Sequence, residues 1–474
     1  MTGFFGRSAP LFGCVLSAAI GLTGCSTEVP YKAPGFPFVR SYHNAQHGNP
    51  VLLSNVAWWK GFKDPTLDAL ITRAFSGNLS LELAKERVTQ AQANLQSISS
   101  NASVSPSASV RRQRRVDSPT ETRSEAALGF SWMFDPYGAR RQRVNAASAR
   151  IEVADAEVDA ARLLLLFNIA NTYVDLRYNQ RILQLRQQNL RSRRKTFALT
   201  QRLFDQRSAT RLDIVRTEAL VAETMAQIPT LRAAVRNRKY ELAVLVGTTI
   251  ENLKIDLDSS ARQPRPKMSP DVGIPADLLR NRPDIRIAER LYYASVADIG
   301  SAKADLYPRL SLGGSIGLAS IRNGSSGSEY FFGPSVQFPS LLNGDRKAVV
   351  AGRYSLARQA HTSWKSNVLQ AILEVETSLL NYSASGASVQ AAHRTSRLYR
   401  EAANLTRDLV ERDSATIRDL IDAEEQIADA DAVLAENMRQ LGRNFVSLNV
   451  SLGSGNSSDD QQAEVTPSNS AVLN

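Results

Sequence analysis

The feature that most constrains this fold is an internal duplication of the chain. Leu163 is matched by Leu369 and Gly247 by Gly453, and many residues between them keep the same offset of 206. Scattered matches of Ala and Leu arise by chance in a helical chain, but a constant offset over about 110 residues does not. The chain is therefore expected to contain one structural unit twice.

Each copy holds long segments that favour the α-helix. Residues 139–204 contain neither Pro nor Gly, and at 1.5 Å per residue such a helix approaches ~100 Å. The helical pattern resumes at 211–247, where Pro229 predicts a kink, and the second copy repeats it at 345–410 and 417–452. Helices of this length do not fit a compact globule, so they indicate a coiled-coil-like or barrel arrangement.

A charged turn separates the two helices of each copy. It reads RSATRLDIVRTE at 207–218 and DSATIRDLIDAE at 413–424, and it predicts the bends of two helical hairpins. A serine or a threonine in each turn is a suitable N-cap for the returning helix. The four alternatives are Ser208 or Thr210 in the first turn, and Ser414 or Thr416 in the second.

Shorter segments between the helices alternate with a period of two residues. Apolar side chains occupy one parity, and Gly, Ser or other small and polar residues occupy the other. Segments of about ten residues with this pattern are typical of transmembrane β-strands, although an antiparallel sheet on a soluble core gives the same alternation. The residues expected to face lipid are Phe130, Trp132, Phe134, Leu310, Leu312 and Phe338.

The pattern contains only four such strands, two in each copy. Four strands leave two open edges, and an open edge is not viable in lipid because its backbone groups stay unpaired. Either the membrane interpretation is wrong, or several chains close one barrel together.

The N-terminus has the pattern of a secretory signal. Arg7 precedes a short apolar run that ends in Leu22-Thr23-Gly24-Cys25, which resembles a bacterial lipobox. Cys14 lies inside the signal, so Cys25 would be the one cysteine of the mature chain and its thiol would be free to carry a lipid. The alternative is a plain signal peptide with an incidental cysteine. A single acyl anchor binds a membrane only weakly, so a second membrane contact is expected.

Composition and motifs disfavour several other classes of function. The 474 residues carry a net charge of +11, which suits anionic partners, but secretion would keep the chain away from nucleic acid. His43 and His47 have helical spacing in a segment with Pro, Gly and Asn and without an acidic ligand nearby. There is no Gly-rich phosphate loop or nucleophile elbow. We therefore expect no enzyme activity, metal or cofactor.

Four motifs then carry a resemblance to a known family. They are WWKGFKDPTLDALITRAFSGNLSLELAKERVTQA at 58–91, SWMFDPYGARRQ at 131–142, IPADLLRNRPDIRIAE at 274–289 and ADIGSAKADLYPRLSLGG at 297–314. In this order, and with the duplication, the chain resembles the outer membrane factors of tripartite efflux systems. These are the TolC-like family, and the resemblance is strongest to its NodT-like lipoprotein branch.

The resemblance implies a homotrimer in the outer membrane of a Gram-negative bacterium. Each chain would contribute four strands to a twelve-stranded barrel, above a long α-helical barrel that crosses the periplasm. The trimer would conduct small toxic compounds passively from an inner-membrane pump and a periplasmic adaptor to the exterior. The alternatives are the outlet of a type I protein-secretion system or a periplasmic adaptor lipoprotein, and the sequence does not name the substrate or the pump.

The resemblance also suggests what the doubled turn does. Family members are closed at the periplasmic end by inner helices, and the alignment places Asp422 at the family's aspartate ring, with Arg418 where an apolar gate residue is common. Residues 410–436 contain nine acids and two bases, whereas 204–230 contain four and three. Our hypothesis is that the second turn faces the axis as a charged gate while the first faces outward to the adaptor. The tip residues are Arg418, Asp422, Asp419, Asp413, Arg211 and Asp213.

The remaining segments complete the expected organisation. An arginine cluster, Arg111, Arg112, Arg114 and Arg115, is expected in an external loop, in contact with lipopolysaccharide phosphates or simply solvated, and 322–328 is the second external loop. The expected segments are a signal peptide (1–24), an extended segment (25–57), repeat 1 (58–247, strands about 103–135, hairpin 139–247), a linker (248–281), repeat 2 (282–453, strands about 306–338, hairpin 345–452) and a disordered tail (454–474).

Overall fold

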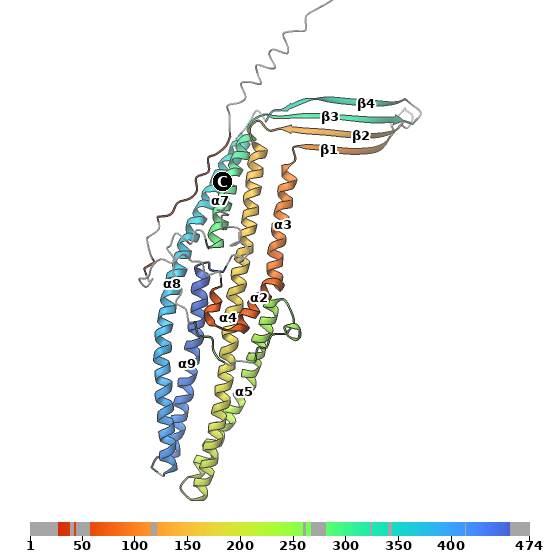
Figure 1. Ribbon diagram of the computed structural model, residues 1–474. Coiled ribbons are helices and arrows are strands. Elements are labelled where there is room, and N and C mark those ends of the chain that lie inside the picture. Colours follow the sequence, from red (N-terminus) through yellow and green to blue (C-terminus); the bar gives the residue numbers. More distant parts are fainter. Residues whose placement is uncertain are drawn as a thin grey trace, which may run out of the picture. The chain divides into compact units, whose positions relative to one another are not determined.

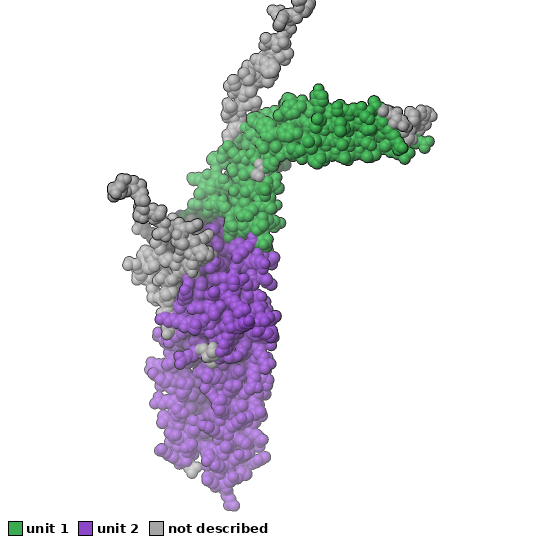
Figure 2. Space-filling model, turned by 45° about the vertical axis from the view of Figure 1, so that its right-hand side comes forward, with its two compact units in different colours: residues 1–36, 86–155, 287–366 green, residues 37–85, 156–286, 367–474 purple. Residues whose placement is uncertain are grey.

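The computed structural model describes residues 27–37, 42–43, 57–114, 121–258, 262–266, 281–322, 325–339, 344–412 and 414–455. The signal peptide, Cys25, Asp413 and residues 456–474 of the expected tail lie outside these ranges. The chain divides into two compact units, shown in Figure 2. Unit 1 contains 1–36, 86–155 and 287–366, and unit 2 contains 37–85, 156–286 and 367–474. Both units therefore draw on both copies of the duplicated sequence.

Unit 1 contains a four-stranded antiparallel sheet in the order β1-β2-β3-β4 (Figure 1). The strands are β1 (Ala102–Gln113), β2 (Glu121–Phe134), β3 (Arg309–Ile321) and β4 (Ser326–Gln337). The four predicted strands are thus present close to the expected bounds, but they run further into the two expected external loops. Arg111 and Arg112 lie inside β1, so the prediction that they belong to a loop was wrong. Likewise, the residues from Ser326 onward belong to β4 rather than to the second external loop.

Helices of unit 1 pack closely through alanine. Ala146 and Ala149 of α4 (Ala139–Asp205) are buried against Ala294 and Ala297 of α7 (Pro283–Ala304). Small side chains let two helix backbones approach one another, which explains the alanine-rich composition here. Within the same unit the Thr27 hydroxyl donates a hydrogen bond of 2.6 Å to the carbonyl of Tyr137, so the N-terminal segment is attached next to the strands.

Unit 2 is built from two helical hairpins that run side by side in Figure 1. The first consists of α4 and α5 (Arg211–Val246), and the second of α8 (Gly344–Glu411) and α9 (Ile417–Ser451). The predicted hairpins are confirmed within two residues at each end. α4 has 67 residues and α8 has 68, which corresponds to about 100 Å each. Pro229 lies inside α5, and the helix continues past it.

The core of unit 2 lies where the hairpins meet the first helices of the chain. Trp58 and Phe62 of η1 (Trp58–Phe62) and four side chains of α2 (Pro65–Gly77) are buried against α4 and Phe445 of α9. The indole nitrogen of Trp58 donates to the carbonyl of Ser454 at 3.1 Å. The conspicuous WWKGF motif is therefore a core element. The remaining helices are α3 (Leu79–Ser99) and η2 (Ile250–Asn252).

The duplicated glycines end the last helix of each copy. Gly247 and Gly453 have φ of +80° and +74°, in the left-handed region that favours glycine. A Cβ on Gly247 would lie 1.9 Å from the carbonyl oxygen of Gly77, and one on Gly453 would lie 2.6 Å from that of Asn281. The match at offset 206 thus preserves a helix end that only glycine fits.

Candidate functional site

The doubled turn forms the same N-terminal capping box in both hairpins. The Thr210 hydroxyl accepts a hydrogen bond from the backbone nitrogen of Asp213 at 3.2 Å, and the Asp213 carboxylate accepts one from the backbone of Thr210 at 2.9 Å. Thr416 and Asp419 repeat these bonds at 3.3 and 2.9 Å. The N-caps are therefore the threonines, and Ser208 does not take this role.

The caps also set the electrostatics of these two aspartates. Hydrogen bonds from the threonine hydroxyl and then the backbone lower the pKa of Asp213 and that of Asp419 below the ordinary value of 3.8. From the sequence, both aspartates were placed among the tip residues. In the structure they are occupied in holding the helix ends.

The other tip residues lie on the surface of the hairpins. Arg211, Arg418 and Asp422 are exposed, and Asp413 is outside the described residues. Arg418 and Asp422 share one face of α9, as their spacing predicts. No ion pair joins these two side chains in the described part of the chain, so the suggested pairing within one chain is not seen. The face continues upward through exposed Glu425 and Asp429.

Apolar side chains hold the two hairpin tips together within unit 2. Val410, Ile417 and Leu420 of the second tip are buried, and Leu199 and Leu203 of α4 pack against them. The buried side of α9 is therefore opposite to the face that carries Arg418 and Asp422. The two tips lie at the same level, because the end of α4 contacts the second turn.

A buried carboxylate joins three helices just above the tips. Glu424 of α9 has a side chain only 8% exposed, and its Oε1 accepts hydrogen bonds from Ser192 at 2.7 Å and Thr196 at 2.9 Å. Arg407 of α8 donates to the same oxygen at 2.9 Å. Sequence reasoning missed this node, although Glu424 continues the buried spacing of Ile417 and Leu420 along α9 and was detectable in that way.

Three further ion pairs, made by two aspartates, fasten α9 along its length. Asp431 receives two hydrogen bonds of 2.8 Å from Arg400 of α8. Asp175 of α4 pairs with Arg439 at 2.8 Å and with Arg443 at 3.0 Å. The side chains of both aspartates are 12% exposed. Part of the acidic excess of the second copy is therefore used inside the hairpin bundle and does not face solvent.

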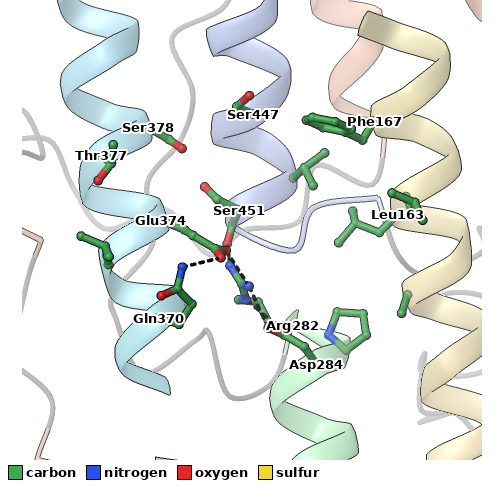
Figure 3. A pocket seen from close by; sticks show the side chains of 15 residues that line it. Leu163, Phe167, Arg282, Asp284, Gln370, Glu374, Thr377, Ser378, Ser447 and Ser451 are labelled. Carbon is green, nitrogen blue, oxygen red and sulfur yellow. Dashed lines mark hydrogen bonds and ion pairs between the residues drawn. The ribbon is translucent and has the colours of Figure 1, made fainter. Parts of the chain in front are cut away.

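Hollows lie along the helices of unit 2. A basic groove of about 590 Å³ runs between α4 and α8 near the tips and is lined by Arg191, Lys195, Arg202, Arg407 and Glu411, among others. A second, mainly apolar hollow of about 650 Å³ lies further up (Figure 3). At its base, Arg282 bridges Asp284 and Glu374, each at 2.8 Å, and donates to the carbonyl of Ser451. This network fixes the start of α7 to α8 and α9.

α8 presents a second apolar face that the described part of its own chain leaves uncovered. Its buried residues, such as Val368, Val375 and Ala403, lie on one side of the helix. Exposed leucines lie on the opposite side at spacings of 4, 7, 18, 7 and 4 residues, all close to whole helical turns. These exposed residues are Leu369, Leu373, Leu380, Leu398, Leu405 and Leu409.

The sheet of unit 1 has one apolar and one polar face. Directly opposed residues share a face, and the register opposes Trp132 to Leu312 and Phe134 to Leu310. Phe130 lies on the same face by alternation, and Phe338 follows one residue after the end of β4. Three of these six side chains are exposed, namely Phe130, Phe134 at 50% and Phe338 at 72%, and the other three are half-buried. Their contact with lipid remains a prediction.

No helix in the described ranges combines the length and apolar character needed to cross a membrane. No set of three or more His, Cys, Asp or Glu side chains there is arranged to hold a metal ion.

Comparison with known proteins agrees with the geometry of both copies. The family model described as "Outer membrane efflux protein" matches residues 71–248 and 274–454, well over half of the chain. The chain belongs to the outer membrane efflux protein family. The two matched segments correspond to the two copies of the duplication, each of which supplies two strands and one hairpin.

This outer membrane efflux protein is similar to known proteins over most of their length. It is 34% identical to nodulation protein T of Rhizobium leguminosarum bv. trifolii, over 94% of this chain and 97% of that one. It is 28% identical to the pyoverdine export outer membrane protein OpmQ of Pseudomonas aeruginosa, over 77% and 79%. The solved outer-membrane channel OprN has a TM-score of 0.82 at 28% identity and covers 91% of this chain and 100% of its own.

These findings confirm the family and fold predicted from the motifs. The fold is mainly helical, with a four-stranded antiparallel sheet, and is that of TolC-like channels. This outer membrane efflux protein is the outer-membrane channel component of a tripartite efflux system in a Gram-negative bacterium.

Proposed function

We propose that the protein acts as a homotrimer that conducts small toxic compounds passively from an inner-membrane pump and a periplasmic adaptor to the exterior. The observation that carries this proposal is the open sheet. β1 and β4 have no strand partner on their outer edges within the described chain, and the apolar face of the sheet is exposed. Three copies would close these edges into a twelve-stranded barrel and satisfy the backbone groups that lipid cannot.

The uncovered face of α8 supports the same arrangement. A helix that is apolar on two opposite sides is expected between two neighbours, and only one of them belongs to its own chain. α5 offers a matching set of exposed side chains. Each of three leucines of α8 has an apolar or aromatic counterpart on α5 at the same distance from its hairpin tip. The pairs are Leu405 and Val215 at ~10 Å, Leu398 and Met225 at ~20 Å, and Leu380 and Tyr240 at ~45 Å.

We therefore assign the subunit contact to α8 of one protomer against α5 of the next. This pairing covers apolar residues of both helices at the same heights and continues around three chains. The second hairpin then turns Arg418 and Asp422 toward the axis. The basic groove of Arg191, Lys195 and Arg202 suits an acidic helix of the adaptor. Among the described residues, Glu411 is the one acidic residue that lines this groove, so there is little repulsion of a negatively charged partner.

Cysteine cross-linking tests the trimer and its register together. Cys25 is the one native cysteine expected in the mature chain. A disulfide between two introduced cysteines therefore reports directly on their proximity. Leu405→Cys combined with Val215→Cys is expected to form an oxidised trimer in isolated membranes. Leu405→Cys with Tyr240→Cys, whose heights differ by ~35 Å, is the matched control and should not cross-link. Equal cross-linking of both pairs, or of neither, would contradict the assigned interface.

A further inference from the structure

We propose that the far end of the sheet binds the phosphate groups of lipopolysaccharide through Arg112 of β1 and Arg322, which follows β3. This proposal rests on the proposed function in one respect, namely that the apolar face of the sheet meets lipid. The sequence grouped Arg111, Arg112, Arg114 and Arg115 without distinction. The structure places Arg111 and Arg112 on opposite faces of the sheet, whereas Arg114 follows β1 and Arg115 lies outside the described residues.

The two arginines are brought together by strand register. Arg112 lies opposite Thr122 of β2, and the backbone nitrogen of Arg322 donates to the carbonyl of Thr122 at 2.9 Å. Since Arg123 is opposed to Ile321, the next position along opposes Thr122 to Arg322. The two arginines therefore flank one threonine on the same face, about 10 Å apart across two strand spacings. Both are exposed.

Alternation places this pair on the apolar face of the sheet. The same parity holds Val110 in β1, Leu128 in β2 and Leu318 in β3. Within the four strands as described, Arg112 is the one charged residue of this face. The carboxylates of the sheet lie on the polar face, where Arg123 forms an ion pair with Glu125. No carboxylate of the strands competes for Arg112 or Arg322.

The distance of the two arginines from the other end of the sheet matches the level of lipid headgroups. Phe134, at the other end of β2, is 12 positions from Thr122, which is ~40 Å along an extended strand. With the usual strand tilt this becomes ~30 Å along the membrane normal, compared with an apolar band of about 25 Å. The arginines would therefore lie ~5 Å beyond the hydrocarbon, at the level of phosphate groups.

The chemistry selects an anionic lipid of the outer leaflet. A guanidinium forms two parallel hydrogen bonds with a phosphate, and such charge-assisted bonds are among the strongest in proteins. Lipopolysaccharide presents phosphates at this depth next to acyl chains that would cover the apolar face below. The opposite end of the strands joins the helices α4 and α8, so the arginine end is the one directed away from the periplasm.

The test uses the purified full-length trimer and counts bound lipid A by native mass spectrometry. The wild type is expected to retain bisphosphorylated lipid A at least tenfold more strongly than its dephosphorylated form. Arg112→Gln with Arg322→Gln should abolish this preference. Arg111→Gln with Arg123→Gln removes the same charge from the polar face, as the matched control, and should leave the preference intact.

The other outcomes overturn the proposal in distinct ways. Equal retention of both lipid A forms by the wild type would mean that acyl contacts alone hold the lipid. Equal loss in both double variants would mean that net charge, and not this pair, is responsible. If Arg112→Gln with Arg322→Gln fails to assemble, Arg112→Lys with Arg322→Lys keeps the charge and should lower the preference only in part. Channel currents from the same samples report separately on the proposed function.

Discussion

At the scale of single residues, the doubled turn separates structural from surface positions. The residues shared by both copies, Thr210 with Asp213 and Thr416 with Asp419, form the capping boxes. Other positions differ between the copies, for example exposed Leu212, which is replaced by exposed Arg418, and exposed Arg211, which is replaced by buried Ile417. The copies thus retain the hairpin bend and differ around it.

The gate assignment predicts a specific loss of closure. Asp422→Ala and Arg418→Ala are each expected to raise the conductance of the closed trimer in planar bilayers and to increase antibiotic leakage in cells. The reason is that three copies of each charge would meet at the axis, where attraction between unlike neighbours holds the tips together. Arg216→Ala, at the position of the first copy that matches Asp422, should have no such effect. Wild-type conductance in both gate variants would refute the assignment.

The capping boxes predict a dependence on pH. The pKa of Asp213 is lowered in the folded state, so its stabilising effect is fully present above the ordinary value of 3.8 and is lost as the pH falls through the lowered pKa. Hydrogen exchange of the first turn of α5, corrected for intrinsic rates, should therefore show less protection below about pH 4. Asp213→Asn should remove this dependence, and an unchanged profile in that variant would contradict the argument.

At the scale of elements, the helices of unit 2 are held by few polar contacts placed between long apolar surfaces. Glu424 joins α9 to α4 and α8, and Asp431 and Asp175 repeat this function higher up. Apolar packing allows helices to slide along one another. Directional hydrogen bonds fix their register, and they do so at three heights along α9.

Removal of Arg407 is expected to loosen the second hairpin from the first. Arg407→Ala leaves Glu424 buried with only two hydroxyl donors, at a cost of about 1–3 kcal/mol, since Arg407 itself is partly exposed. Glu424→Gln should cost less, because an amide still accepts from Ser192 and Thr196. Chemical denaturation of the purified protein gives both values. A larger loss for Glu424→Gln than for Arg407→Ala would exclude the proposed role of the arginine.

At the scale of the whole molecule, two membrane contacts are expected to act together. The lipobox predicts an acyl group on Cys25, and the sheet offers an exposed apolar face in each chain. One acyl chain gives only weak, reversible attachment, whereas a closed barrel is retained permanently. We therefore expect an acyl group on Cys25 to serve delivery and orientation more than retention.

This division predicts the behaviour of a chain without the lipid. Cys25→Ala, secreted with an unlipidated signal peptide, should incorporate no labelled palmitate and still fractionate with the outer membrane. Replacement of Phe134 and Leu310 by Asp in the lipidated chain should instead impair insertion, because charge on the lipid side of a strand is unfavourable. Release of the Cys25→Ala chain into the periplasm would contradict the expected role of the sheet.

The sequence by itself determined the repeated architecture of this protein. Hydrophobic period and helix-breaking residues are local properties of the sequence. Residues 139–204 lack helix breakers, the strand segments alternate between apolar and small residues, and Gly247 and Gly453 end helices. The hairpins, the strands and the family can therefore be predicted from the sequence alone. The tertiary structure decided which charges face inward. Glu424 and Arg418 lie six positions apart in the same acidic stretch, yet one is buried among three helices and the other is exposed. Similarly, the face on which each arginine of the sheet lies was set by strand length and register. These depend on contacts between residues far apart in the chain, such as Thr122 with Arg322, which no local pattern records.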